Sequence, residues 1–167
     1  MAKQLLLVRH GKSDLGDSNL SDFDRPLNAR GHRNAPEMAK RILAKDQVPQ
    51  LIVSSPALRA ITTAMHFAQI WNIPADQIQQ EPSIYEANTR ALLGVVNKLG
   101  DEYGKVVLFG HNPGLTELAN YLSDANIYNL PTCGTVLMSF DLDHWAEVSS
   151  DSGTLLDFDY PKSLDED

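Results

Sequence analysis

The sequence predicts a single three-layer α/β domain, with a mostly parallel central sheet and helices on both of its faces. Short apolar runs typical of buried strands alternate along the chain with longer segments of helical periodicity. The length of 167 residues suits one domain with a sizeable core, and 43% hydrophobic and 22% charged residues are ordinary for a globular protein. We expect one domain over residues 1–160 and a frayed acidic tail over residues 161–167.

The predicted strands are short runs of aliphatic and β-branched residues, of which the third is brief and the sixth is weak. They cover residues 4–9, 51–54, 78–80, 105–110, 136–140 and 154–158. If the first, second and fourth of these strands are parallel neighbours, their carboxyl ends meet at one end of the sheet. Open α/β sheets bind their ligands outside the carboxyl ends of the strands.

The first predicted helix has two candidate starts and ends near Lys45. Asn28 and Asn34 are both capping residues, and Pro36 is tolerated only near the start of a helix. The apolar stripe of the first helix is predicted to consist of Met38, Ala39, Ile42 and Leu43. Another helix is predicted further along the chain, near residues 89–99.

Two further helices are predicted to start with a capping residue followed by proline. These pairs are Ser55-Pro56 and Asn112-Pro113. The apolar face of the helix after the first pair is predicted to consist of Leu58, Ile61, Met65, Ala68 and Ile70.

Charge and cysteine content narrow the class of partner and the compartment. The net charge of −8 argues against nucleic acid, whose binding depends on many Lys and Arg contacts to phosphate. No apolar run approaches the roughly 20 residues of a membrane helix, and the start of the chain lacks the features of a secretory signal. The single cysteine, Cys133, excludes an internal disulfide. We predict a cytoplasmic protein that binds neither nucleic acid nor membrane.

Three of the predicted strands end in groups that can hold an anion. The first ends in Arg9 and His10, the second is followed by Arg59, and the fourth is followed by His111. In an acidic chain a phosphate site must be made locally, by arginines gathered in one pocket. Each of these residues alone has a structural interpretation, but their occurrence at three successive strand–helix junctions predicts a phosphate site.

His10 is the candidate nucleophile of this site. A neutral imidazole attacks phosphorus readily, and two nearby guanidinium groups would lower its pKa and favour the neutral form. Gly11 permits a tight turn and a close approach of the backbone to a ligand. Arg59 offers a planar fork that matches phosphate oxygens, close to the amino end of a helix.

The pattern resembles the histidine phosphatase superfamily, in which an Arg-His-Gly (RHG) triplet follows an N-terminal strand and a Gly-His pair lies downstream. The fuller set resembles the short branch of this superfamily, the SixA-type phosphohistidine phosphatases. The resemblance spans about residues 3–140, and it implies a phosphoglycerate-mutase-like fold. The stretches that carry it are residues 7–14, 24–31, 54–60 and 110–114.

The resemblance implies a two-step phosphoryl transfer that needs no metal or cofactor. His10 would attack phosphorus and become phosphohistidine, while Arg9, Arg59 and His111 hold the phosphoryl oxygens. Water would then hydrolyse the intermediate. The other histidines lack metal-ligand spacing and are interpreted as scattered surface or helix-face residues: His32, His66 and His144.

A proton donor for the leaving group is less clearly marked. Larger members of the superfamily use an acidic residue, for which Glu86 is the candidate here. Asp22 and Asp24, in the long polar loop at residues 12–27, are alternatives. A phosphohistidine substrate releases imidazole, whose pKa of about 6.5 lessens the need for a general acid.

The leading prediction is a hydrolase that removes phosphate from phosphohistidine in a partner protein of the phosphotransfer-domain type. The short chain has no large insertion that would build a lid over a small sugar phosphate, which favours an open site. The first alternative is a phosphatase for small phosphomonoesters, and the second is a non-catalytic phosphate-binding module. A mutase is a further alternative. Lys12 is either another phosphate contact or a surface residue.

Overall fold

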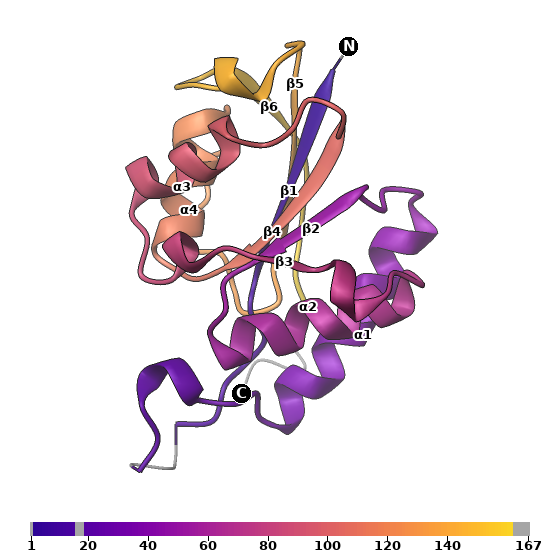
Figure 1. The fold of residues 1–167 in the computed structure, drawn as a ribbon, viewed down its shortest axis with the longest axis vertical. Helices are drawn as coiled ribbons and strands as arrows, with labels where there is room; N and C mark the ends of the chain where they lie inside the picture. The colour runs from indigo at the N-terminus through magenta and orange to yellow at the C-terminus, as the bar shows by residue number, and fades with distance from the viewer. Residues whose placement is uncertain (1, 16–18, 162–167) are drawn as a thin grey trace.

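The computed structural model describes residues 2–15 and 19–161 and contains a central six-stranded sheet (Figure 1). The predicted acidic tail beyond Pro161 lies outside the described residues. The strands are β1 (Lys3–Arg9), β2 (Leu51–Ser54), β3 (Gln79–Gln80), β4 (Lys105–Gly110), β5 (Thr135–Phe140) and β6 (Gly153–Asp159). They lie in the order β3-β2-β4-β1-β5-β6.

Strands β2, β4 and β1 are parallel neighbours, as the motif pattern predicts. Arg9 is in register with Gly110, and Ser54 is in register with Phe109. The carboxyl ends of the three strands therefore lie at the same end of the sheet. Strand β5 runs antiparallel to β1, and β6 runs antiparallel to β5, so the sheet as a whole is mixed.

Helices cover both faces of the sheet, which confirms the predicted three-layer arrangement (Figure 1). α1 (Ala29–Ala44) and α2 (Leu58–Ile70) pack on one face, and α3 (Thr89–Asn97) and α4 (Gly114–Leu122) pack on the other. No helix in the described part of the chain is both long and apolar enough to span a membrane. Short 3-10 helices lie at Asp22–Asp24, Ala75–Gln77, Pro82–Ile84 and Trp145–Glu147.

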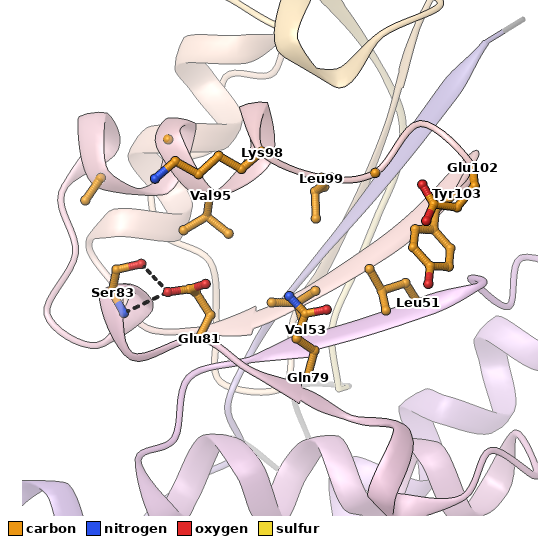
Figure 2. A pocket seen from close by; sticks show the side chains of 13 residues that line it. Leu51, Val53, Gln79, Glu81, Ser83, Val95, Lys98, Leu99, Glu102 and Tyr103 are labelled. Atoms are coloured by element: carbon orange, nitrogen blue, oxygen red, sulfur yellow. Dashed lines mark hydrogen bonds between the residues drawn. The ribbon is translucent and has the colours of Figure 1, made fainter.

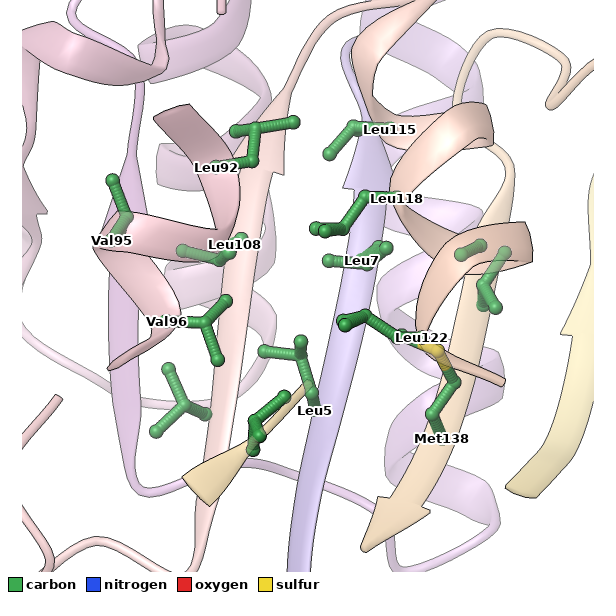
Figure 3. Close-up of a cluster of buried hydrophobic side chains, with 14 of the residues drawn as sticks. Leu5, Leu7, Leu92, Val95, Val96, Leu108, Leu115, Leu118, Leu122 and Met138 are labelled. Atoms are coloured by element: carbon green, nitrogen blue, oxygen red, sulfur yellow. The ribbon is translucent and has the colours of Figure 1, made fainter. Parts of the chain in front are cut away.

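Alternate residues of β1 serve the two halves of the core. Leu5 and Leu7 pack with α3 and α4 (Figure 3), whereas Leu6 and Val8 pack with α1 and α2. Burial of a leucine side chain stabilises the fold by roughly 1.5–3 kcal/mol. Because both faces are covered, the central strands are continuous apolar runs rather than alternating ones.

α1 begins at Ala29, because the side chain of Asn28 accepts a hydrogen bond from the Gly31 N–H at 2.9 Å. The alternative start at Asn34 is therefore wrong. Pro36 lies inside the helix, where it removes one backbone donor from the ladder. The sequence alone does not decide which of the two asparagines caps α1, whereas the hydrogen bond of the Asn28 side chain does.

The serine–proline pair does not start α2, which begins at Leu58 with Ala57 as its N-cap. Instead, the hydroxyl of Ser55 accepts the Ala57 N–H at 3.2 Å and lies 2.8 Å from His111 Nε2. α4 likewise begins after Pro113 rather than at it. Both helices therefore begin later than predicted, because the polar residues at these junctions make hydrogen bonds within the loops and at the candidate site.

The predicted apolar face of α2 is wrong in part: Ala68 is buried and Ile70 packs against the core, but two of the other predicted residues are exposed. Leu58 and Met65 are 41% and 44% exposed, and Leu43 of α1 is also exposed. Small alanines let α2 lie close to its neighbours, and two polar residues of the buried face point to the strand ends, so hydrophobicity alone selects part of the face wrongly. The buried residues of α2 are Arg59, Ala60, Thr63, Ala64, Phe67 and Ala68.

Phe67→Ala should lower the free energy of unfolding by about 3–5 kcal/mol. Phe67 is fully buried, with the rings of Trp71 and Phe109 at centroid distances of 5.3 and 5.0 Å. Met65→Ala, on the exposed face of the same helix, is the matched control and should cost less than about 1 kcal/mol. Urea unfolding measures both values, and equal losses would mean that α2 packs through its other face.

Candidate active site

The four predicted core residues lie around one hollow at the carboxyl ends of β1, β2 and β4. Arg9, His10, Arg59 and His111 all line this hollow, whose volume is about 370 Å³. They come from the end of β1, the first turn of α2 and the loop after β4. The remaining lining residues are Lys12, Ser13, Leu15, Asp22, Arg25, Asn112 and Thr132.

The hydrogen bonds of His10 define which of its ring nitrogens is free. Nδ1 lies 2.7 Å from the carbonyl oxygen of Gly11. Because a carbonyl oxygen only accepts, Nδ1 carries the proton and Nε2 keeps its lone pair. Arg59 Nε lies 3.4 Å from this Nε2. Nε2 is therefore the ring atom available to attack a ligand.

Burial keeps the His10 imidazole neutral. The side chain is only 7% exposed, and loss of solvent lowers its pKa from 6.5 to about 3. The hydrogen bond to Gly11 opposes this shift, whereas His111, Arg59 and Arg9 add to it. At neutral pH His10 is thus a nucleophile rather than a cation.

Two glycines hold the loop of His10 against α1 and α2. The Gly11 N–H donates to Thr63 Oγ1 at 2.9 Å, and the Thr63 hydroxyl donates to the Arg59 carbonyl at 2.8 Å. A Cβ on Gly31 would lie 2.3 Å from the carbonyl oxygen of Lys12, so only glycine fits there. These contacts explain why Gly11 and Gly31 belong to the motif stretches.

Arg9 and Arg59 bring buried positive charge to the hollow. The Arg59 side chain is 6% exposed. Arg9 Nη1 donates to the carbonyl of Leu130 at 2.9 Å, while its buried Nε has no hydrogen-bond partner in the described structure. A buried donor without a partner is costly, and an anion would satisfy it.

His111 completes the cluster beside the nucleophile. Its ring centroid lies 5.2 Å from that of His10. Burial, followed by the charge of Arg59, lowers the pKa of His111 to about 4, so this ring is also neutral. Its buried Nδ1 has no partner among the described residues. The uncharged ring can share the hollow with a protonated arginine without repulsion.

Asp22, Arg25 and Tyr85 form a network at the mouth of the hollow that the sequence did not reveal. The carboxylate of Asp22 accepts hydrogen bonds from Arg25, Arg59 and the Tyr85 hydroxyl. The hydroxyl of Tyr85, and then Arg25, hold the pKa of Asp22 well below its usual range. Asp22 is therefore ionised at neutral pH, which argues against its predicted role as an alternative proton donor. The only sequence signal was the presence of Asp22 and Arg25 in the long polar loop.

Glu86 does not line the hollow that contains His10. It is an exposed residue with a φ of 58°, and it borders an adjoining cavity of about 390 Å³ that also touches His111 and Asn112. Asp24, the other alternative donor, is also exposed, and its carboxylate accepts the Ser21 hydroxyl at 3.0 Å. Of the three predicted carboxylates, only Asp22 reaches the hollow.

A larger cavity lies away from this cluster. It has a volume of about 560 Å³ and lies between α3 and the β2–β3 side of the sheet (Figure 2). Val53, Val95 and Leu99 line it, and Glu81 at its border is hydrogen-bonded to Ser83. None of the four predicted core residues borders this cavity, so size alone would misplace the active site.

The remaining histidines are not all scattered, contrary to the prediction. Nδ1 of His32 on α1 lies 2.9 Å from Nε2 of His66 on α2. His144 is a surface residue beside Asp101. Across residues 2–15 and 19–161 no group of three or more His, Cys, Asp or Glu side chains is arranged to hold a metal ion.

Comparisons with known proteins agree with this geometry. The model of the histidine phosphatase superfamily (branch 1) matches residues 5–98, which include Arg9, His10 and Arg59 but not His111. An uncharacterised chloroplast protein of Arabidopsis thaliana is 30% identical over 161 residues, which cover 92% of this chain and 73% of that protein.

Solved structures agree in fold. The SixA protein of Agrobacterium tumefaciens superposes with a TM-score of 0.80 at 25% identity, covering 96% of this chain and 99% of its own. A protein histidine phosphatase SixA complexed with tungstate superposes with a TM-score of 0.81 at 21% identity, with coverage of 96% and 99%. With its SixA-like fold and its family match, the chain belongs to the histidine phosphatase superfamily (branch 1) and is a phosphohydrolase.

Proposed function

We propose that this phosphohydrolase is a metal-free phosphatase that forms a covalent phosphohistidine on His10 and acts on phosphohistidine in a partner protein. The observation that carries the proposal is the state of His10, a buried neutral imidazole whose Nε2 is unprotonated and accepts a long hydrogen bond of 3.4 Å from Arg59 Nε. The similarity to a solved protein histidine phosphatase supports the substrate class.

In the first step, the lone pair of His10 Nε2 forms a bond to phosphorus as the bond to the leaving nitrogen breaks. Nδ1 keeps its proton, and the Gly11 carbonyl that accepts it stabilises the positive charge that develops on the ring. In the second step, water attacks phosphorus, the ring leaves as neutral imidazole, and one proton of the water passes to the phosphate. Both steps begin and end with the same tautomer of His10.

Arg9, Arg59 and His111 would stabilise the charge of the transferred group. The two guanidinium groups offer N–H donors to the phosphoryl oxygens in a site largely shielded from water, where such bonds are strong. His111 is neutral and contributes a hydrogen bond rather than a charge. Lys12 also borders the hollow, which favours its interpretation as a further phosphate contact.

The acid–base state of the hollow favours a phosphohistidine substrate. Asp22 is the acidic residue among those that line it, and Asp22 is held ionised. An alkoxide leaving group would need a protonated acid at this point, whereas an imidazole that is already protonated on its far nitrogen leaves without one. The partner would therefore present a phosphorylated histidine of a phosphotransfer domain.

A phosphatase for small phosphomonoesters is the second candidate, and one observation favours it. Glu86 borders the cavity next to the hollow and shares His111 with it. A small shift of this exposed carboxyl group toward the hollow would supply a proton donor.

We expect the protein to work in a reducing compartment such as the cytoplasm, since its only cysteine, Cys133, is a buried thiol.

Phosphate release from phosphohistidine and from an aryl phosphate, measured with wild type and His10→Ala, tests the function. We expect the phosphohistidine activity to exceed the aryl phosphatase activity and to fall about 10³-fold or more in the variant. His144→Ala, a surface histidine, is the control and should keep full activity. Activity confined to the aryl phosphate would move the assignment to small esters, and a wild type that acquires no phosphoryl label would be a binding module.

Glu86→Gln tests the proton donor, with Glu117→Gln as the matched control because Glu117 borders the same cavity. We expect both variants to hydrolyse phosphohistidine at the wild-type rate, since the leaving group needs no external acid. If Glu86 does protonate ester leaving groups, Glu86→Gln alone will lose about 10²-fold or more on an alkyl phosphate monoester, whose alkoxide leaving group needs an acid.

The lowered pKa of His10 predicts a pH-dependent stability. The unfolded chain takes up a proton on His10 below pH 6.5, whereas the native chain does so only near pH 3, so stability is full above pH 6.5 and declines as the pH falls. Between pH 7.5 and 5 this group should cost about 2 kcal/mol. Urea unfolding of wild type and His10→Gln across this range measures it, and parallel curves for the two proteins would contradict the buried neutral state.

A further inference from the structure

The carboxylate of Asp22 is hydrogen-bonded to the guanidinium group of Arg59, to which the proposed mechanism assigns phosphate binding. We propose that Asp22 is an internal competitor for the phosphate site, whose carboxylate holds Arg59 in the free protein and leaves it when a phosphoryl group binds. The inference rests on the proposed function only in that Arg59 is taken to bind phosphate.

Four donors converge on the two carboxylate oxygens of Asp22. Oδ2 accepts the Tyr85 hydroxyl at 2.6 Å and Arg59 Nη2 at 3.0 Å. Oδ1 accepts Arg25 Nη2 at 2.8 Å and Arg25 Nε at 3.1 Å. A carboxylate has about four acceptor positions, so all of them are used. Two arginines and a hydroxyl around one anion is also the arrangement expected around a bound phosphate.

Arg59 is engaged by Asp22 through both of its terminal nitrogens. Nη1 donates to the backbone carbonyl of Asp22 at 2.6 Å, Nη2 donates to the carboxylate, and Nε faces His10. A phosphoryl group on His10 Nε2 that takes the fork of Arg59 in a bidentate pair needs these donors. Two anions that share one guanidinium repel each other, so the phosphoryl group and Asp22 compete.

The asymmetry of burial decides which partner moves. The Arg59 side chain is 6% exposed and fixed in α2, whereas the Asp22 side chain is 53% exposed. The short helix Asp22–Asp24 contributes no buried residue to the core. Release of Asp22 therefore moves an already half-exposed carboxylate into water, while displacement of Arg59 would disrupt the buried cluster.

Tyr85 couples the position of Asp22 to the site. Its hydroxyl holds the carboxylate, Phe23 packs edge-on against its ring at 5.1 Å, and its ring packs against His111 at 5.5 Å. When Asp22 leaves, Tyr85 and Arg25 are freed as donors beside the incoming group. Asp22 thus sets the affinity of the site for phosphate and favours release of the product.

Binding of inorganic phosphate, measured by calorimetry at low ionic strength, tests this competition without any turnover. Asp22→Asn keeps the shape of the side chain and removes its charge, and we expect phosphate to bind about fivefold more tightly. Asp24→Asn is the matched control, because Asp24 lies in the same turn and contacts Ser21 rather than Arg59. It removes the same charge and should change the affinity much less.

Equal effects of the two variants would overturn the proposal, since the gain would then reflect overall charge. Weaker binding by Asp22→Asn would also overturn it, because Asp22 would then position Arg59 rather than compete for it. If Asp22→Asn does not fold, Asp22→Ala removes the exposed carboxylate altogether and should tighten phosphate binding as well, and unchanged or weaker binding would count against the competition. Wild type that binds phosphate but does not hydrolyse phosphohistidine would contradict the proposed function and leave this inference intact.

Discussion

The placement of two guanidinium groups, one buried and one half-buried, beside an uncharged histidine governs the rest of this site. The chain has a net charge of −8, yet Arg9 and Arg59 stand together at the ends of β1 and α2. Their charge, added to the loss of solvent, keeps His10 and His111 neutral. Arg59 also donates a hydrogen bond to the carboxylate of Asp22, whose pKa is held low mainly by the hydroxyl of Tyr85 and by Arg25. Burial and positive charge together therefore set the protonation states around the hollow.

The fold holds that cluster through contacts that are remote in sequence. Thr63 links the backbone of Gly11 to the carbonyl of Arg59, so the loop of the nucleophile and the first turn of α2 move as one unit. Gly31 lets α1 approach the carbonyl of Lys12 so closely that no side chain fits between them. His10 thus lies in a loop that is held against two packed helices, an arrangement that would limit its motion during the proposed phosphoryl transfer.

The sequence predicted the elements, and the proximity of the four candidate residues, well because both depend on local patterns. The strands at residues 51–54 and 105–110 are uninterrupted apolar runs, and the residues that follow them are pinned to the strand ends by the topology. The apolar face of α2 was predicted partly wrongly because two polar residues, Arg59 and Thr63, are buried beside the candidate site rather than in the apolar core. The contact between Asp22 and Tyr85 joins residues 63 positions apart through a hydroxyl and a carboxylate, and no local pattern encodes such a pair.

The proposed substrate class follows from the proton states of the site rather than from its size. The histidines of the site are neutral and Asp22, the carboxylate that lines it among the described residues, is ionised, so these groups have no proton to give to an alkoxide. The site does have two arginines to hold a phosphoryl group and a nucleophile that retains its own proton on Nδ1. A phosphohistidine that is protonated on its far nitrogen already carries a proton on its leaving group. Such a substrate needs no general acid from the site. The proposed competition between Asp22 and phosphate would fit a transient encounter with a partner protein, because weak retention of the product would return the site to its free state after each transfer.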